Sequence, residues 1–153
     1  MRRFLICLLL LGPLLPAMAG DAVTGRVVKV LPFLLDLEGR NARSPSLYDR
    51  DAYQAFLRDH DSQCSAIRFD VLWKASDDRN AKLKLRLELH GISQDGMPRE
   101  RTLEHTVTPH FFRRWNSLTL GGDDYKNFGE LIAWRVTLWS GDKMLSEQKS
   151  FLW

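Results

Sequence analysis

Residues 82–90 read Lys-Leu-Lys-Leu-Arg-Leu-Glu-Leu-His, with a leucine at every second position from Leu83 to Leu89. In a β-strand, alternate side chains point to opposite faces, so this stretch would have one leucine face and one polar face. Leucine is also a good helix former. A helix would place Leu83 and Leu85 on different faces, however, so the strict period of two predicts a strand.

The same alternation, or a short apolar run, recurs along the rest of the chain. Turn residues such as Ser93–Gly96 separate these segments. Pro32 lies inside the first segment and cannot donate a ladder hydrogen bond, which predicts either an edge strand or two strands joined by a kink. The predicted strands cover residues 25–37, 67–74, 82–90, 99–107, 112–120, 132–138 and 144–153.

One segment has helical spacing instead. Residues 44–49 read Ser-Pro-Ser-Leu-Tyr-Asp, which combines a capping hydroxyl, an early proline and an acid in the first turn. From Tyr48 onward the apolar residues recur at intervals of three and four, which predicts a helix over 47–59. A second, shorter helical turn is expected near 123–128.

About seven short strands with one inserted helix near 47–59 predict an all-β, mainly antiparallel fold of two layers, because amphipathic strands need a second apolar layer. Residues 133–138 (Ala-Trp-Arg-Val-Thr-Leu), the turn at 140–143 and the run to Phe151 resemble the last hairpin of immunoglobulin-like and fibronectin type III-like modules. The resemblance implies an immunoglobulin-like β-sandwich. The inserted helix and the lack of a cysteine pair depart from the immunoglobulin pattern.

The first 19 residues predict a signal peptide. Arg2 and Arg3 precede an apolar run over 4–15, and Ala17-Met18-Ala19 has the small-x-small form that signal peptidase accepts. Cleavage after Ala19 would release a single domain over 20–153 into the periplasm or the exterior. No later apolar segment is long enough for a transmembrane helix.

Charge and composition narrow the classes of partner. Two of the 22 basic residues and none of the 19 acidic residues lie in 1–19, so the exported chain would carry 20 against 19. A net charge near +1 gives no support to nucleic-acid binding. The hydrophobic content of 44% excludes wholesale disorder.

The sequence predicts no cofactor and no metal. Cys64 is the only cysteine after residue 19, which excludes an internal disulfide, and it is expected under a strand start. Acidic pairs at 77–78 and 123–124 lack the calcium-loop pattern. The four histidines, His60, His90, His105 and His110, lack the spacing of zinc ligands. His90 and His105 lie on neighbouring predicted strands, but their positions place them on opposite faces of the sheet.

No catalytic set emerges from the motifs either. The chain contains no Gly-x-Ser-x-Gly sequence. Glu88 and Glu104 could in principle form a glycosidase pair, but both lie among cations and are predicted to form cross-strand ion pairs. A carbohydrate-active or metal-dependent accessory enzyme domain stays an alternative.

The aromatic residues supply the candidate contact site. Trp73 and Trp134 occupy the same alternate positions of their strands as the apolar residues, so both are expected in the core. Other aromatic side chains lie among polar neighbours, where a ring can stack on a sugar or anchor a protein interface. The predicted contact residues are Trp115, Trp139, Tyr48 and Tyr53.

Together these patterns predict a secreted, non-catalytic binding or scaffolding module that contacts a protein or glycan partner through an aromatic surface. Its oligomeric state is left open. The ending Phe151-Leu152-Trp153 also resembles the closing strand of outer-membrane barrels, so a small barrel is a further alternative.

Overall fold

The computed structural model describes residues 23–76, 82–110 and 112–153. The predicted signal peptide over 1–19 and the acidic pair at 77–78 lie outside these ranges. The described chain forms seven strands, two α-helices and one 3-10 turn: β1 (Gly25–Asp36), α1 (Leu47–Asp59), η1 (Asp61–Gln63), β2 (Cys64–Ala75), β3 (Leu83–Ile92), β4 (Pro98–Val107), β5 (Arg114–Gly121), α2 (Gly122–Phe128), β6 (Glu130–Ser140) and β7 (Lys143–Lys149).

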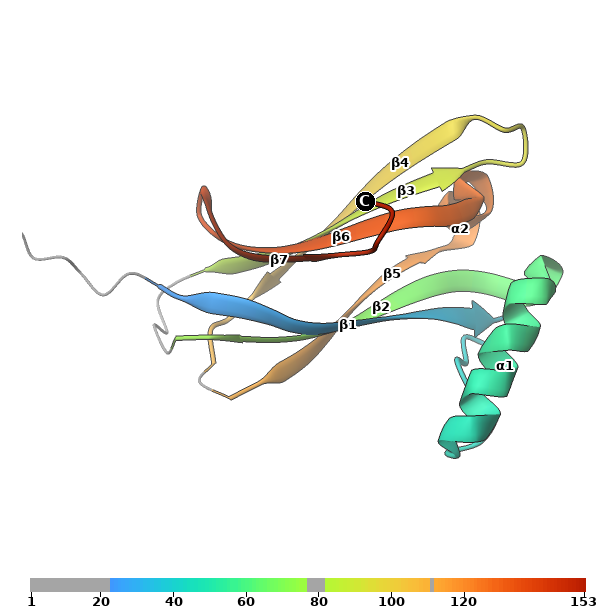
Figure 1. The fold of residues 1–153 in the computed structure, drawn as a ribbon, viewed down its shortest axis with the longest axis horizontal. Helices are drawn as coiled ribbons and strands as arrows, with labels where there is room; N and C mark the ends of the chain where they lie inside the picture. The colour runs from blue at the N-terminus through green and yellow to red at the C-terminus, as the bar shows by residue number, and fades with distance from the viewer. Residues whose placement is uncertain (1–22, 77–81, 111) are drawn as a thin grey trace, which may run out of the picture.

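The strands form two antiparallel sheets, which confirms the expected class of mainly antiparallel β-structure. One sheet has three strands in the order β1-β2-β5, and the other has four in the order β4-β3-β6-β7. The sheets lie as two layers, with α1 standing at one end beyond β1 and β2 (Figure 1). The described strands therefore form two separate, open sheets.

The leucines of β3 point inward, as their alternation predicts. Leu83, Leu85, Leu87 and Leu89 are each 0% exposed. They pack in one core with residues of the facing sheet, including Phe69 and Trp73. This apolar core joins the two layers, because burial of apolar surface is the main force that stabilises such a fold.

The outward face of β3 is polar and ion-paired. Glu88 lies opposite Arg135 with an N–O distance of 2.9 Å, and Glu104 lies opposite Arg86 at 2.8 Å. The predicted cross-strand ion pairs are therefore confirmed. Each of these ion pairs stabilises the sheet by only about 0.2–1 kcal/mol.

Every strand differs from its predicted bounds by one to four residues at one end or both; β2, for example, begins at Cys64 rather than at 67. β5 begins at Arg114 rather than at 112, and β7 ends at Lys149 rather than at 153. The chain then turns after Ser150, where the amide of Trp153 donates to the carbonyl oxygen of Ser150 at 3.3 Å. Trp153 stacks on His90 with ring centroids 4.1 Å apart. Alternation alone cannot distinguish this return over the sheet from a continued strand.

β1 is one continuous strand at the edge of its sheet, which confirms the first of the two predictions for Pro32. A bulge between Val27 and Lys29 shifts its register against β2. The other edge strands are β5, β4 and β7. Over the described ranges, neither helix has the length and apolar character needed to cross a membrane.

Candidate functional site

The four predicted contact residues lie at three separate places. Trp115 is paired in register with Leu72 on the outer face of the three-stranded sheet and is 51% exposed. Trp139 lies on the outer face of the other sheet, where its indole N–H donates a 2.7 Å hydrogen bond to Thr137 Oγ1. The two tryptophans thus face away from each other across the molecule.

Tyr48 and Tyr53, by contrast, share α1 at one end of the two layers. The helix begins where predicted: Ser46 is the N-cap, and its hydroxyl accepts from the amide of Asp49. Trp115 is the second residue of β5. The start of β5 lies at the end of its sheet away from α1 (Figure 1). Only Tyr48 and Tyr53 therefore share an element, and, five residues apart, they lie on different sides of α1.

α1 is attached to the layers through two buried side chains, Gln54 and Leu57. The Gln54 amide accepts from the amide of Leu34 and donates to the carbonyl oxygen of Leu34, both at 2.9 Å. It also donates to the carbonyl oxygen of Asn41. The side chain thus completes the backbone hydrogen bonds of β1 as a neighbouring strand would.

The rest of α1 carries a stacked row of rings. The ring centroids of Tyr53 and Phe56 are 6.0 Å apart, and those of Phe56 and His60 are 4.1 Å apart. The guanidinium of Arg43 lies 4.7 Å from the centre of the Tyr53 ring. Tyr48 is 83% exposed and Phe56 is 40% exposed. An aromatic surface flanked by arginine is typical of the centre of protein interfaces.

A buried carboxylate fixes the loop between β1 and α1. Asp36 is 5% exposed. It accepts hydrogen bonds from the amides of Glu38 and Arg40, the Arg40 guanidinium and the Tyr53 hydroxyl. Burial alone would raise the pKa of Asp36, but these four donors outweigh it and lower the pKa to about 2. The carboxylate is a structural anchor for Tyr53.

Next to α1 lies an open cleft of about 510 Å³ between the two sheets. Its apolar lining comes from β1, β2, α2 and β6, and its polar lining includes Gln54 and Arg58 of α1. A second hollow of about 770 Å³ shares Tyr125 and Glu130 with it. Volumes of this size and apolar walls with a few polar groups are typical of ligand sites. The apolar residues of the first cleft are Pro32, Leu34, Ile67, Phe128 and Leu131.

Cys64 is buried beneath this end of the molecule, as predicted for the start of a strand. Its Sγ lies 3.4 Å from the carbonyl oxygen of Leu57. Burial raises the pKa of the Cys64 thiol, and burial likewise raises the pKa of the neighbouring Tyr125 phenol. A neutral, enclosed thiol is a poor nucleophile.

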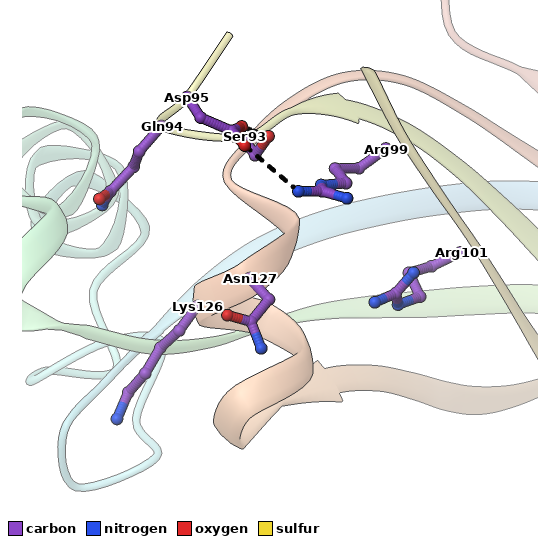
Figure 2. A pocket seen from close by; sticks show the side chains of 7 residues that line it. All are labelled: Ser93, Gln94, Asp95, Arg99, Arg101, Lys126 and Asn127. Carbon is purple, nitrogen blue, oxygen red and sulfur yellow. Dashed lines mark hydrogen bonds and ion pairs between the residues drawn. The ribbon is translucent and has the colours of Figure 1, made fainter. Parts of the chain in front are cut away.

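A polar pocket of about 400 Å³ lies between the β3–β4 turn and α2 (Figure 2). Arg99 and Arg101 reach it from β4, and Lys126 reaches it from α2. Arg99 lies 3.5 Å from the Asp95 carboxylate, and Arg101 lies 3.6 Å from that of Asp124. Both guanidiniums therefore already have carboxylate partners, and among the described residues only Lys126 of the three lining cations has no ion pair.

The histidines are dispersed. His60 contacts the carbonyl oxygen of Phe56, and His90 lies 3.7 Å from Glu100 on the outer face. His105 is paired in register with the inward-facing Leu85, which confirms the predicted opposite faces of His90 and His105. In the described part of the chain, no three His, Cys, Asp or Glu side chains gather as a metal site would require.

Sequence reasoning missed Asp36, Gln54 and Phe56 as parts of this region. Helical spacing placed Phe56 on the same face as Tyr48, which was a usable signal. Nothing in the local pattern marks Gln54 as buried, because its partners come from β1, 20 residues away in sequence.

Comparisons with known proteins found no family model, no curated protein and no solved structure that matches the chain.

Proposed function

We propose that the chain is an exported, non-catalytic binding module with an immunoglobulin-like or fibronectin type III-like β-sandwich. The strand order supports the sandwich assignment, since the first, second and fifth strands form one layer and the other four form the second. The basic, apolar and small-x-small pattern of residues 1–19 supports export.

The partner we propose is a protein, and its contact surface is α1. One observation carries this proposal: α1 buries only Gln54 and Leu57, while the aromatic side chains at Tyr48 and Phe56 face outward. A helix that contributes so little to the core exposes apolar surface at a cost, and such surface is typical of interfaces. The adjacent cleft would receive an apolar side chain of the partner.

Site-specific photo-crosslinking in the producing cells tests the contact. A photoreactive residue at position 48 is expected to give one defined protein adduct, and Phe56→Ser in the same chain is expected to reduce it. Met144, which is 47% exposed on β7, supplies the matched control position. Equal adducts from positions 48 and 144, or no adduct from position 48, would contradict the proposed surface.

Export is tested separately by mass spectrometry of the protein recovered outside the cytoplasm. The expected mature form begins at Gly20. A form that retains Arg2 and Arg3 in the cytoplasm would overturn the exported location without bearing on α1.

A further inference from the structure

The end of the molecule away from α1 carries a concentration of positive charge. The register of β1 and β2 sets Arg26 directly opposite Lys74. Arg113 precedes the first residue of β5, and these three side chains line one open hollow of about 820 Å³. All three are exposed.

The next row on the same outer face adds another cation and a ring. Lys29 is paired in register with Leu72, and Leu72 is paired with Trp115. Side chains two residues apart on one strand face are about 7 Å apart. We call this surface the basic face and define it as Arg26, Lys29, Lys74 and Arg113 around Trp115.

No ion pair joins these four cations to any carboxylate of the described residues. Asp70, in the following row, is held by Arg68 at 2.9 Å and by the Ser117 hydroxyl at 2.6 Å. On the other sheet, the exposed Arg99 does have a carboxylate partner, Asp95, at 3.5 Å. The basic face therefore gathers on one surface four cations that have no carboxylate partner among the described residues.

Like charges directly opposite each other on neighbouring strands destabilise a sheet. The Arg26–Lys74 pair therefore opposes folding slightly, while both side chains are placed to attract an anion. The exposed Trp115 ring beside them provides an apolar plane on which a sugar ring can stack, and its N–H supplies a polar edge.

We propose that the basic face binds an acidic polysaccharide, with the four cations against its carboxylate or sulfate groups and Trp115 against a pyranose ring. A membrane surface fits less well, since the Trp115 ring lies on a strand face rather than at a protruding tip. Nucleic acid fits less well, since only a few positive charges are gathered here. This site is independent of the protein contact at α1.

Binding is measured by titration calorimetry of the full chain against polygalacturonate and dextran sulfate, with unmodified dextran as the neutral polymer. Both acidic polymers are expected to bind more weakly as salt rises, and dextran is expected not to bind. Lys74→Glu and Trp115→Ala are each expected to weaken binding at least about fivefold. Lys143→Glu, the same charge change on an exposed residue of β7, is the matched control and is expected to leave binding unchanged.

Thermal unfolding of the variants separates binding from folding. Lys74→Glu would place a carboxylate opposite Arg26, so its stability is expected to equal or exceed that of the parent chain. Failure of both acidic polymers to bind would overturn the proposal, as would an undiminished affinity in Trp115→Ala. Equal affinity for duplex DNA or for anionic phospholipid vesicles would overturn it in favour of a general anionic surface.

Discussion

The phenol of Tyr53 donates a 2.7 Å hydrogen bond to the carboxylate of Asp36, and so joins the exposed helix to the end of β1. Asp36 also accepts from two backbone amides and from Arg40. One buried acid therefore holds both the loop that leads to α1 and a ring of the proposed contact surface.

Removing the Tyr53 hydroxyl is expected to destabilise the protein. Hydrogen bonds to charged groups stabilise by ~1.5–3 kcal/mol, so Tyr53→Phe should lower the free energy of unfolding by about that amount in urea titrations at neutral pH. Tyr48→Phe is the control, because Tyr48 is 83% exposed. Equal stabilities of the two variants would contradict the anchoring role of Asp36.

Acid should weaken the same anchor. The folded pKa of Asp36 is about 2, below the ordinary value of 3.8. The carboxylate thus stabilises the fold fully above pH 3.8, and that contribution is lost as the pH falls toward 2. We expect Asp36→Asn to lose less stability than the parent chain over this interval in urea titrations. Parallel pH profiles of the two proteins would show that the pKa is not depressed.

Leu87 provides a test of the core. It is 0% exposed, so Leu87→Ala should cost about 2–5 kcal/mol of unfolding free energy. The matched substitution Leu152→Ala removes the same atoms from a side chain that is 67% exposed and should change stability little. A small effect of Leu87→Ala in chemical denaturation would show that the two sheets do not pack across this position.

Gly91 provides a second packing test, because β3 passes closely beneath α2 there. An added Cβ would lie 2.6 Å from Cζ of Phe128 and 2.7 Å from the carbonyl oxygen of Glu130. Gly91→Ala should therefore cost about 1–3 kcal/mol in thermal unfolding. At Gly121 the nearest atom, Cβ of Ala66, is 3.3 Å away, so Gly121→Ala should be milder. The reverse order of stabilities would contradict the close contact between β3 and α2.

Cys64 should react slowly with thiol reagents in the native protein. Its Sγ is buried, and burial raises the pKa of the thiol, so little thiolate is present or accessible. In the form that begins at Gly20 this is the only thiol, and its reaction with a disulfide reagent is followed by absorbance with and without urea. Reaction in native conditions as fast as in urea would place Cys64 at the surface.

Local periodicity predicted most of the secondary structure. The alternation over 83–89 predicted both the strand and its buried face, and the capping pattern before Leu47 predicted the start of α1. These features depend on neighbours in sequence. Its polar neighbours also predicted that Trp139 lies outside the core, and its indole N–H is hydrogen-bonded to Thr137 on the outer face of β6.

The grouping of residues on the surface could not be predicted, because it depends on strand pairing and not on alternation within a strand. Alternation indicates that Trp115 and Trp139 point away from the core. It does not indicate which sheet each strand joins, so their positions on the outer faces of two different sheets could not be predicted. The pairing of Arg26 with Lys74 depends on the bulge after Val27, which has no sequence mark. Long-range register therefore decides which side chains meet.

The two longer edge strands, β1 and β4, also affect whether copies of this protein associate with each other. Open borders invite strands of other molecules to add on, which leads to aggregation. β1 carries Pro32, which has no amide hydrogen to offer an incoming strand, and β4 carries charged residues of both signs at Arg99, Glu100, Arg101 and Glu104. Both features hinder the addition of strands from other copies of this protein at these two edges.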